Sequence, residues 1–234
     1  MAKKIKVKKG ILITILVCLS YAGSQAQGFF GGFDESFSRA SLRGKLDAKS
    51  EENVAGSPYS TEKFILSEIS GVPMLVLVRY NGYRDEVEIK KDDEVYVLPK
   101  DTVYGEITPK NTNYKIKFLK NITVKGEDRK GYFFSLFDKN NVELLKKDRV
   151  VVQKAKESDN SYGVSEPSKY IKAKLEYYIK RNDGSVMEFP KGKKELIALY
   201  PAKKAEIETF LKENKVSFKE EKDMVKITEF IASL

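Results

Sequence analysis

The side chains that most enzymes use for acid–base and nucleophilic chemistry are scarce in this sequence. Its 234 residues include no histidine and one cysteine, Cys18. Ser-His-Asp and Cys-His mechanisms are therefore excluded, because both need an imidazole base. Zinc sites draw most of their ligands from His and Cys, so the sequence holds no recognisable zinc site. We expect no cofactor and no metal ion.

The remaining chemistry is that of carboxylates, serine and lysine. A carboxylate pair or a Ser-Lys dyad can act without histidine. Asp, Glu, Ser and Lys occur throughout the chain, but none stands in a diagnostic spacing, and there is no Walker loop. The sequence therefore favours a non-catalytic protein that binds or supports another component. The alternative is a carboxylate-dependent hydrolase acting on glycan or peptidoglycan.

Aromatic and arginine side chains are the candidates for a binding surface. Arg79, Tyr80 and Tyr83 cluster around Asn81-Gly82, and such side chains are enriched where proteins bind each other. We therefore select these three as candidate partner-binding residues. The alternative interpretation is that they pack across neighbouring strands.

Short strands are the elements that must position these residues. Asn81-Gly82 and Asp183-Gly184 each predict a hairpin, because these pairs readily adopt the positive φ angles of a type I′ turn. Residues 72–78 are continuously apolar, which predicts a strand covered on both faces. Alternating or apolar runs between polar breaks predict further strands at 87–90, 94–98, 114–118, 131–137, 142–145, 149–153, 170–181 and 186–189.

The last forty-odd residues change to a helical period. Pro201 suits the first position of a helix, and Asn214 could end it in a left-handed conformation. Ser217 to Glu220 has the spacing of a capping box before a final helix. In that helix an apolar stripe is expected to pack on the protein's own sheet or on a neighbouring helix. The stripe consists of Met224, Ile227, Ile231 and Leu234.

These elements predict an α+β fold. A mainly antiparallel β-sheet domain is expected over 58–190, as a meander, a half-barrel or a sandwich, followed by two or three short helices over 191–234. Residues 27–57 begin with a Gly/Phe-rich stretch and are expected to form a flexible N-terminal arm. Phe29, Phe30 and Phe33 could alternatively anchor a partner.

The first 26 residues have the pattern of a secretory signal peptide. Five lysines within residues 1–9 precede an apolar run from Ile11 to about Ala22, and Ser24 and Ala26 suit cleavage before Gln27. The run is too short for a confident membrane span, so we expect no transmembrane span after cleavage. Without the five lysines, 38 basic residues would face 34 acidic ones, lowering the net charge from +9 to +4. Nucleic-acid binding is therefore not expected.

Two groups of short motifs carry a resemblance. They are Gly56-Ser57-Pro58-Tyr59, Val72-Pro73, Arg79-Tyr80-Asn81, Tyr83, Asp85-Glu86-Val87-Glu88, and, near the C-terminus, Lys193-Lys194-Glu195-Leu196, 210–215 and 220–226. Together they resemble a family of uncharacterised exported proteins of the Bacteroidetes. The family more often has a bulky apolar residue at the position of Gly82, which leaves open a turn nearer Arg84-Asp85. The resemblance implies a Gram-negative envelope location and brings no activity, ligand or catalytic residue.

Export and the resemblance together set the expected location and partners. We expect a periplasmic or outer-membrane-associated protein whose partner is an outer-membrane or periplasmic protein. A structural or surface-layer role is a further hypothesis. Asp101-Thr102-Val103 resembles the Asp-Thr-apolar signal for O-glycosylation in that phylum, so glycosylation of Thr102 is a hypothesis as well.

Overall fold

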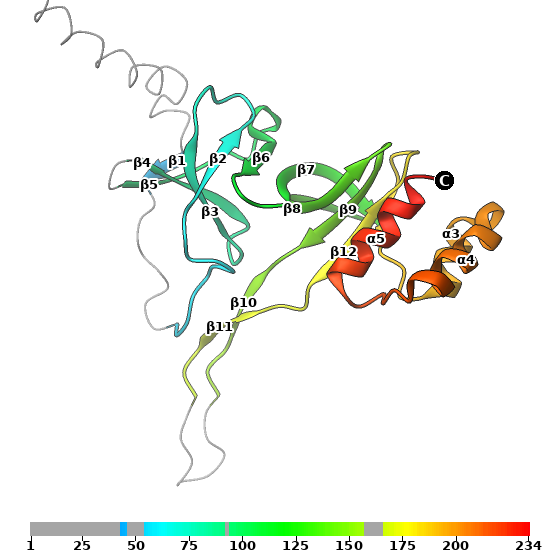
Figure 1. The fold of residues 1–234 in the computed structure, drawn as a ribbon. Coiled ribbons are helices and arrows are strands. Elements are labelled where there is room, and N and C mark those ends of the chain that lie inside the picture. Colours follow the sequence, from blue (N-terminus) through cyan, green and yellow to red (C-terminus); the bar gives the residue numbers. More distant parts are fainter. Residues whose placement is uncertain (1–42, 46–53, 92–93, 157–165) are drawn as a thin grey trace, which may run out of the picture.

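Residues 43–45, 54–91, 94–156 and 166–234 are described by a computed structural model of this chain (Figure 1). The predicted signal peptide and most of the predicted arm, including its three phenylalanines, lie outside the described residues. Within the described residues, one eleven-stranded sheet is joined by a two-stranded sheet and by three α-helices near the C-terminus.

The strands pair antiparallel throughout. In the large sheet their spatial order is β1-β5-β4-β3-β2-β6-β7-β8-β9-β12-β13, and β10 pairs with β11. The strands are β1 (Arg43–Lys45), β2 (Ile65–Ile69), β3 (Val76–Asn81), β4 (Glu86–Lys91), β5 (Glu94–Val97), β6 (Glu106–Pro109), β7 (Lys115–Val124), β8 (Glu127–Lys139), β9 (Val142–Lys147), β10 (Val150–Gln153), β11 (Lys169–Lys172), β12 (Glu176–Lys180) and β13 (Val186–Glu188).

The predicted α+β class is confirmed, because a mainly antiparallel sheet is followed by short helices. Most sheet neighbours are also consecutive in sequence, as in a meander, and the sheet is open rather than a closed barrel. The helices are α3 (Lys193–Leu199), α4 (Lys204–Asn214) and α5 (Glu221–Ile231), with short 3₁₀ segments at η1 (Thr102–Tyr104) and η2 (Pro201–Lys203).

The sheet bends back on itself. β3 and β8 are four places apart in the strand order, so in a flat sheet they would lie about 19 Å apart. The ring of Tyr80 on β3 nevertheless lies 5.2 Å from that of Phe134 on β8, in an edge-to-face contact. The concave side of this bend holds one buried core shared by β2, β3, β4, β6, β7 and β8.

A single carboxylate, that of Asp85, joins the two arms of the bend. Asp85 lies in the β3–β4 loop, and its Oδ1 accepts hydrogen bonds from Tyr80 Oη at 2.7 Å and Lys147 Nζ at 2.7 Å. The backbone N–H of Tyr132 also donates to this oxygen, at 3.3 Å. Lys147 Nζ donates in addition to the carbonyl of Tyr132, at 2.8 Å. The loop is thereby fixed to β8 and β9.

Gly131 makes room for this contact. A Cβ atom at position 131 would lie 2.0 Å from Asp85 Oδ2 and 2.9 Å from Lys147 Nζ. The residue also has φ = +146°, a conformation that side chains rarely adopt. Only glycine therefore lets the carboxylate approach the β8 backbone.

The predicted hairpin at Asn81-Gly82 exists, but its turn lies elsewhere. Asn81 pairs with Glu86 across β3 and β4, so the loop is 82–85, and the positive φ occurs at Asp85 (52°). The prediction of a type I′ turn at Asn81-Gly82 is therefore wrong. The loop includes Arg84 and Asp85, as the alternative proposed, but β3 ends at Asn81. Gly82 instead allows a close approach to β10, because a Cβ there would lie 3.0 Å from the side chain of Val150.

Two predicted strands are shorter than expected. Residues 72–75 form a loop, and β3 begins at Val76. The expected strand over 170–181 is divided into β11 and β12, which belong to different sheets. The first sequence is continuously apolar and the second mixes aromatic, aliphatic and charged residues. Neither composition reveals where backbone pairing begins or changes from one partner to another.

The apolar stripe of α5 packs on the protein itself, as predicted. Met224, Ile227 and Ile231 are buried in a core that includes Val142 and Leu144 of β9. Leu234 is 38% exposed and lies beyond the end of α5, so its inclusion in the stripe is wrong. The phenyl rings of α4 and α5 add a stacked contact at 4.1 Å.

The predicted ends of these helices differ by a few residues. Pro201 begins η2 immediately before α4, and the left-handed residue after α4 is Lys215 rather than Asn214. The predicted capping box is wrong, because α5 begins after Glu220 without a side-chain cap. The carboxylate of Asp223 instead accepts a hydrogen bond from the backbone N–H of Ser217 at 2.9 Å.

We predict that Gly131→Ala destabilises the protein by about 3 kcal/mol, the scale of breaking a buried ion pair. Gly126→Ala is the matched control: Gly126 also has positive φ (80°), but a Cβ there would meet no atom within 4 Å. The control should lose only about 1 kcal/mol, from backbone strain. Urea unfolding measures both. Equal losses would show that Gly131 is needed only for its backbone angle.

Candidate functional site

Arg79 lies in a buried polar cluster on the convex side of the sheet. It pairs with Glu88 across β3 and β4. The Glu88 carboxylate is fully buried and accepts hydrogen bonds from Arg79 Nε at 3.1 Å and from one of its terminal nitrogens at 2.6 Å. Tyr59 Oη at 3.0 Å and Asn81 Nδ2 at 3.1 Å donate to the other oxygen. The charge on Glu88 is thus fully compensated inside the protein.

Aromatic rings cover the guanidinium of Arg79. Its carbon lies 3.7 Å from the centre of the Tyr59 ring and 4.3 Å from that of Phe64. Burial, and then the negative charge of Glu88, raises the pKa of Tyr59 to about 12. The Arg79 side chain is only 16% exposed, so most of its surface is already used.

Tyr80 points to the opposite face of β3, because side chains alternate along a strand. It is buried in the concave core, with its ring against Phe134 and its hydroxyl on Asp85. Burial, and then the charge of Asp85, raises the pKa of Tyr80 well above its ordinary value. Burial also lowers the pKa of Lys147, and Asp85 opposes that shift by favouring the charged ammonium.

Tyr83 lies in the β3–β4 loop, in a third environment. Its ring makes an edge-to-face contact with Tyr170 of β11 at 5.2 Å. Its backbone N–H lies 3.2 Å from the carbonyl of Pro58, to which it donates. The three predicted binding residues therefore do not form one exposed surface, and they take part in packing and hydrogen bonds between strands. Their role in partner binding stays a prediction.

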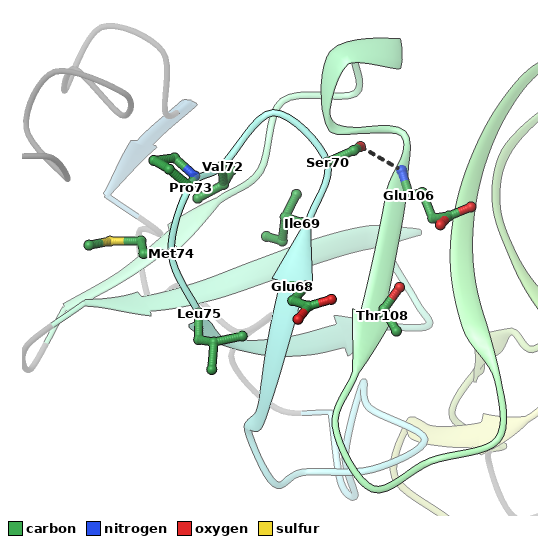
Figure 2. A pocket seen from close by; sticks show the side chains of 9 residues that line it. All are labelled: Glu68, Ile69, Ser70, Val72, Pro73, Met74, Leu75, Glu106 and Thr108. Atoms are coloured by element: carbon green, nitrogen blue, oxygen red, sulfur yellow. Dashed lines mark hydrogen bonds between the residues drawn. The ribbon is translucent and has the colours of Figure 1, made fainter.

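An open hollow of about 470 Å³ lies on the convex side, between β2, β6 and the loop Val72–Leu75 (Figure 2). We call it the outer pocket. One wall is apolar, with Pro73, Met74 and Leu75, and the other carries the polar side chains of β2 and β6. Ser70 Oγ accepts a hydrogen bond from the backbone N–H of Glu106 at 3.1 Å and so joins the two strands at this wall.

Two carboxylates line the outer pocket, as a hydrolase would require. Glu68 and Glu106 have side chains that are 61% and 42% exposed, and each pairs with a lysine, Lys110 and Lys115 respectively. Figure 2 shows that the two carboxylate groups do not point toward each other. Neither carboxylate is enclosed by the protein, since both side chains are well exposed.

Three leucines form an exposed apolar surface beside the outer pocket. Leu66 and Leu77 face each other across β2 and β3, and Leu75 immediately precedes β3. They are 42%, 38% and 45% exposed, respectively. We call these residues the leucine patch. Because exposed apolar side chains rarely gather on a monomer without a role, the patch is a candidate docking surface.

The sequence pattern does not reveal the leucine patch. Residues 72–78 are continuously apolar, and this favoured a strand covered on both faces. In the structure Val76 and Val78 face the core, whereas Leu75 and Leu77 face outward. A run without alternation cannot reveal which of its faces is covered, so the sequence contained no usable signal.

The described parts of the chain contain no group of three or more Asp, Glu, His or Cys side chains that could hold a metal ion. In the same parts, no helix has the length and apolar character needed to cross a bilayer. Thr102 is exposed in η1, and its hydroxyl lies 3.3 Å from Asp101 Oδ1. Glycosylation of Thr102 stays a hypothesis.

Comparison with known proteins gives no relative to guide the interpretation of these sites. No protein-family model, curated protein or solved structure matches the chain.

We predict that Arg79→Leu destabilises the protein by about 3–5 kcal/mol, because it leaves the Glu88 carboxylate buried without a counter-charge. The double variant Arg79→Leu, Glu88→Leu should recover much of this loss, since it removes both charges. Urea unfolding of the single and double variants provides the comparison. If the double variant lost as much unfolding free energy as the two single variants together, the two residues would not act as a pair.

Proposed function

We propose that this protein is a non-catalytic, exported component of the bacterial cell envelope that binds another envelope protein through the leucine patch. The observation that carries the proposal is the exposure of Leu66, Leu75 and Leu77 on one face of neighbouring strands. The patch continues into the apolar wall of the outer pocket through Leu75 and Met74. A partner that covers this surface would remove it from water, which is favourable.

Three acids of the sheet and its loops are already ion-paired, which supports binding rather than catalysis. Glu88 is held by Arg79, and Asp85 is held by Lys147. Glu143, 3% exposed, lies 2.6 Å from Lys117 Nζ and accepts a hydrogen bond from Ser135. These carboxylates complete structural ion pairs, so they are poorly placed to exchange protons with a substrate.

Export, the periplasmic or outer-membrane-associated location and the relation to Bacteroidetes envelope proteins are supported by the sequence pattern of residues 1–26 and by the motifs described above. The partner is accordingly an outer-membrane or periplasmic protein. The leucine patch suits a protein partner. It would form the centre of the interface, and the centres of protein interfaces are depleted in charge.

A carboxylate-dependent hydrolase remains the second candidate, on the observation that Glu68 and Glu106 share the outer pocket. Their exposure and their lysine partners argue against it. Release of soluble fragments from purified peptidoglycan, abolished in Glu106→Gln, would establish this alternative in place of the binding function.

We predict that Leu66→Lys, Leu77→Lys abolishes recovery of the partner when the tagged protein is purified from native envelopes after mild crosslinking. Two lysines in the patch would place unpaired charges in the interface, which is costly. The circular dichroism spectrum should stay that of the folded protein. The melting temperature should fall only slightly, because the two lysines repel each other across β2 and β3 but both side chains reach water.

Leu234→Lys is the matched control, since Leu234 has the same exposed fraction, 38%, as Leu77 but lies at the C-terminus, away from β2 and β3 (Figure 1). It should retain the partner. Mass spectrometry of the crosslinked peptides should place the contact on β2 and β3. A partner recovered equally by the double variant, or crosslinked only elsewhere, would refute the assignment of the leucine patch.

A further inference from the structure

A second group of exposed apolar side chains lies on residues 150–156 and 166–175, which contain β10 and β11. We call these residues the ribbon. It continues the β9–β12 pair beyond the large sheet (Figure 1). Val151 and Ile171 are opposite each other on its two strands and are 38% and 39% exposed, and Leu175, after β11, is 41% exposed. The ribbon therefore presents apolar side chains to water on a different sheet from the leucine patch.

One face of the ribbon is used inside the protein. Val150 is buried, and on the same face the ring of Tyr170 contacts that of Tyr83 in the β3–β4 loop. Because side chains alternate along a strand, Val151 and Ile171 point to the opposite face. Their exposed fractions show that the described chain leaves this outward face open to a partner.

The ribbon is rich in lysine. It contains one acid, Glu166, and five lysines, which are Lys154, Lys156, Lys169, Lys172 and Lys174. The connecting residues 157–165 lie outside the described residues and add Glu157 and Asp159 to the sequence. Five lysines thus stand against three acids over the whole of 150–175.

Most of these positive charges are not used inside the protein. Lys169 pairs with Glu166 at 3.2 Å, and Lys172 donates to the backbone carbonyl of Ser60 at 3.2 Å. The other three lysines are exposed and pair with none of the described acids, namely Lys154, Lys156 and Lys174. Their flexible stems let the ammonium groups reach past the edges of a ribbon only two strands wide. The outward face therefore has an apolar centre and a positive rim.

The size of the outward face favours a lipid surface over a protein. The longer segment of the ribbon, 166–175, has ten residues. At about 3.4 Å per residue and about 10 Å across two strands, one face covers at most about 340 Å². Each partner in a stable protein interface contributes about 800 Å². A bilayer surface requires no matching shape, because each lysine near anionic headgroups adds its own attraction and apolar side chains enter the headgroup region.

We propose that the ribbon docks on a membrane surface that contains anionic phospholipids. Val151 and Ile171 enter the headgroup region, and the three exposed lysines pair with lipid phosphates. This contact would hold the protein at a membrane without a transmembrane span. It goes beyond the proposed binding of a protein through the leucine patch and does not depend on it, since the two surfaces belong to different sheets.

The experiment is flotation of the protein, purified after export, with vesicles of phosphatidylcholine alone or mixed with an equal amount of phosphatidylglycerol. We expect the protein to float with the mixed vesicles and to stay behind with phosphatidylcholine alone. Raising NaCl to roughly 0.5 M should release most of the bound protein, because the Debye length then falls to about 4 Å.

A triple variant tests the positive rim. Lys154→Gln, Lys156→Gln, Lys174→Gln should weaken binding to the mixed vesicles about a hundredfold, since each lysine near an anionic surface contributes a factor of about five. All three positions are exposed, so the variant should fold normally.

The matched control removes the same charge from exposed lysines of α3 and α4, as Lys194→Gln, Lys204→Gln, Lys212→Gln. It should float like the unmodified protein.

A double variant tests the apolar centre. Val151→Thr, Ile171→Thr keeps the β-branched shape that strands favour but removes apolar surface from the headgroup region. It should weaken binding to the mixed vesicles about tenfold while the circular dichroism spectrum stays that of the folded protein.

Several results would overturn the proposal. These are failure of the unmodified protein to float with the mixed vesicles, equal losses in the two triple variants, and unchanged binding of Val151→Thr, Ile171→Thr. A dimer in analytical ultracentrifugation that this double variant cannot form would assign the ribbon to a second copy of the chain instead. None of these results would affect the leucine patch, whose partner is recovered in a separate experiment.

Discussion

The contact of the Asp85 carboxylate with β8 and β9 holds the two arms of the bent sheet together. The carboxylate lies in a loop between β3 and β4, yet it is bound by Lys147 of β9 and by the backbone of β8. Because β3 and β8 are four places apart in the strand order, this contact requires the sheet to bend back on itself. The bend creates the concave core, in which β2 and β3 lie opposite β7 and β8.

The same contact explains several residues whose identity is otherwise arbitrary. Gly131 is required because Oδ2 of Asp85 occupies the space of a side chain, and Tyr80 is held in the core by its bond to Oδ1. Ion pairing recurs at Glu88 and Glu143, each buried with a basic partner. The buried charges of this protein thus hold strands together. The proposed docking surface lies elsewhere, on the outward leucines of β2 and β3.

Local features of the fold were predictable from the sequence, and long-range ones were not. Alternation and turn residues predicted the strands around 94–98 and 142–145 and the hairpin at Asp183-Gly184, because these depend on neighbouring residues. Strand β6 was missed, since its four residues form a strand through pairing with β2, almost forty residues away. The candidate residues Arg79 and Tyr80 were correctly placed beside a hairpin, but pattern alone could not reveal that one is held by Glu88 and the other by Asp85.

A double-mutant cycle measures directly how strongly the Asp85–Lys147 contact holds the bent sheet together. Asp85→Asn, Lys147→Met and the combined variant would be compared with the unmodified protein by urea unfolding at neutral pH. The combined variant should lose about 2 kcal/mol less than the sum of the single losses, because each single variant leaves the other side chain without its partner at a site where Lys147 is only 11% and Asp85 only 23% exposed. Losses that add within about 0.5 kcal/mol would contradict it, because independent sites behave in that way.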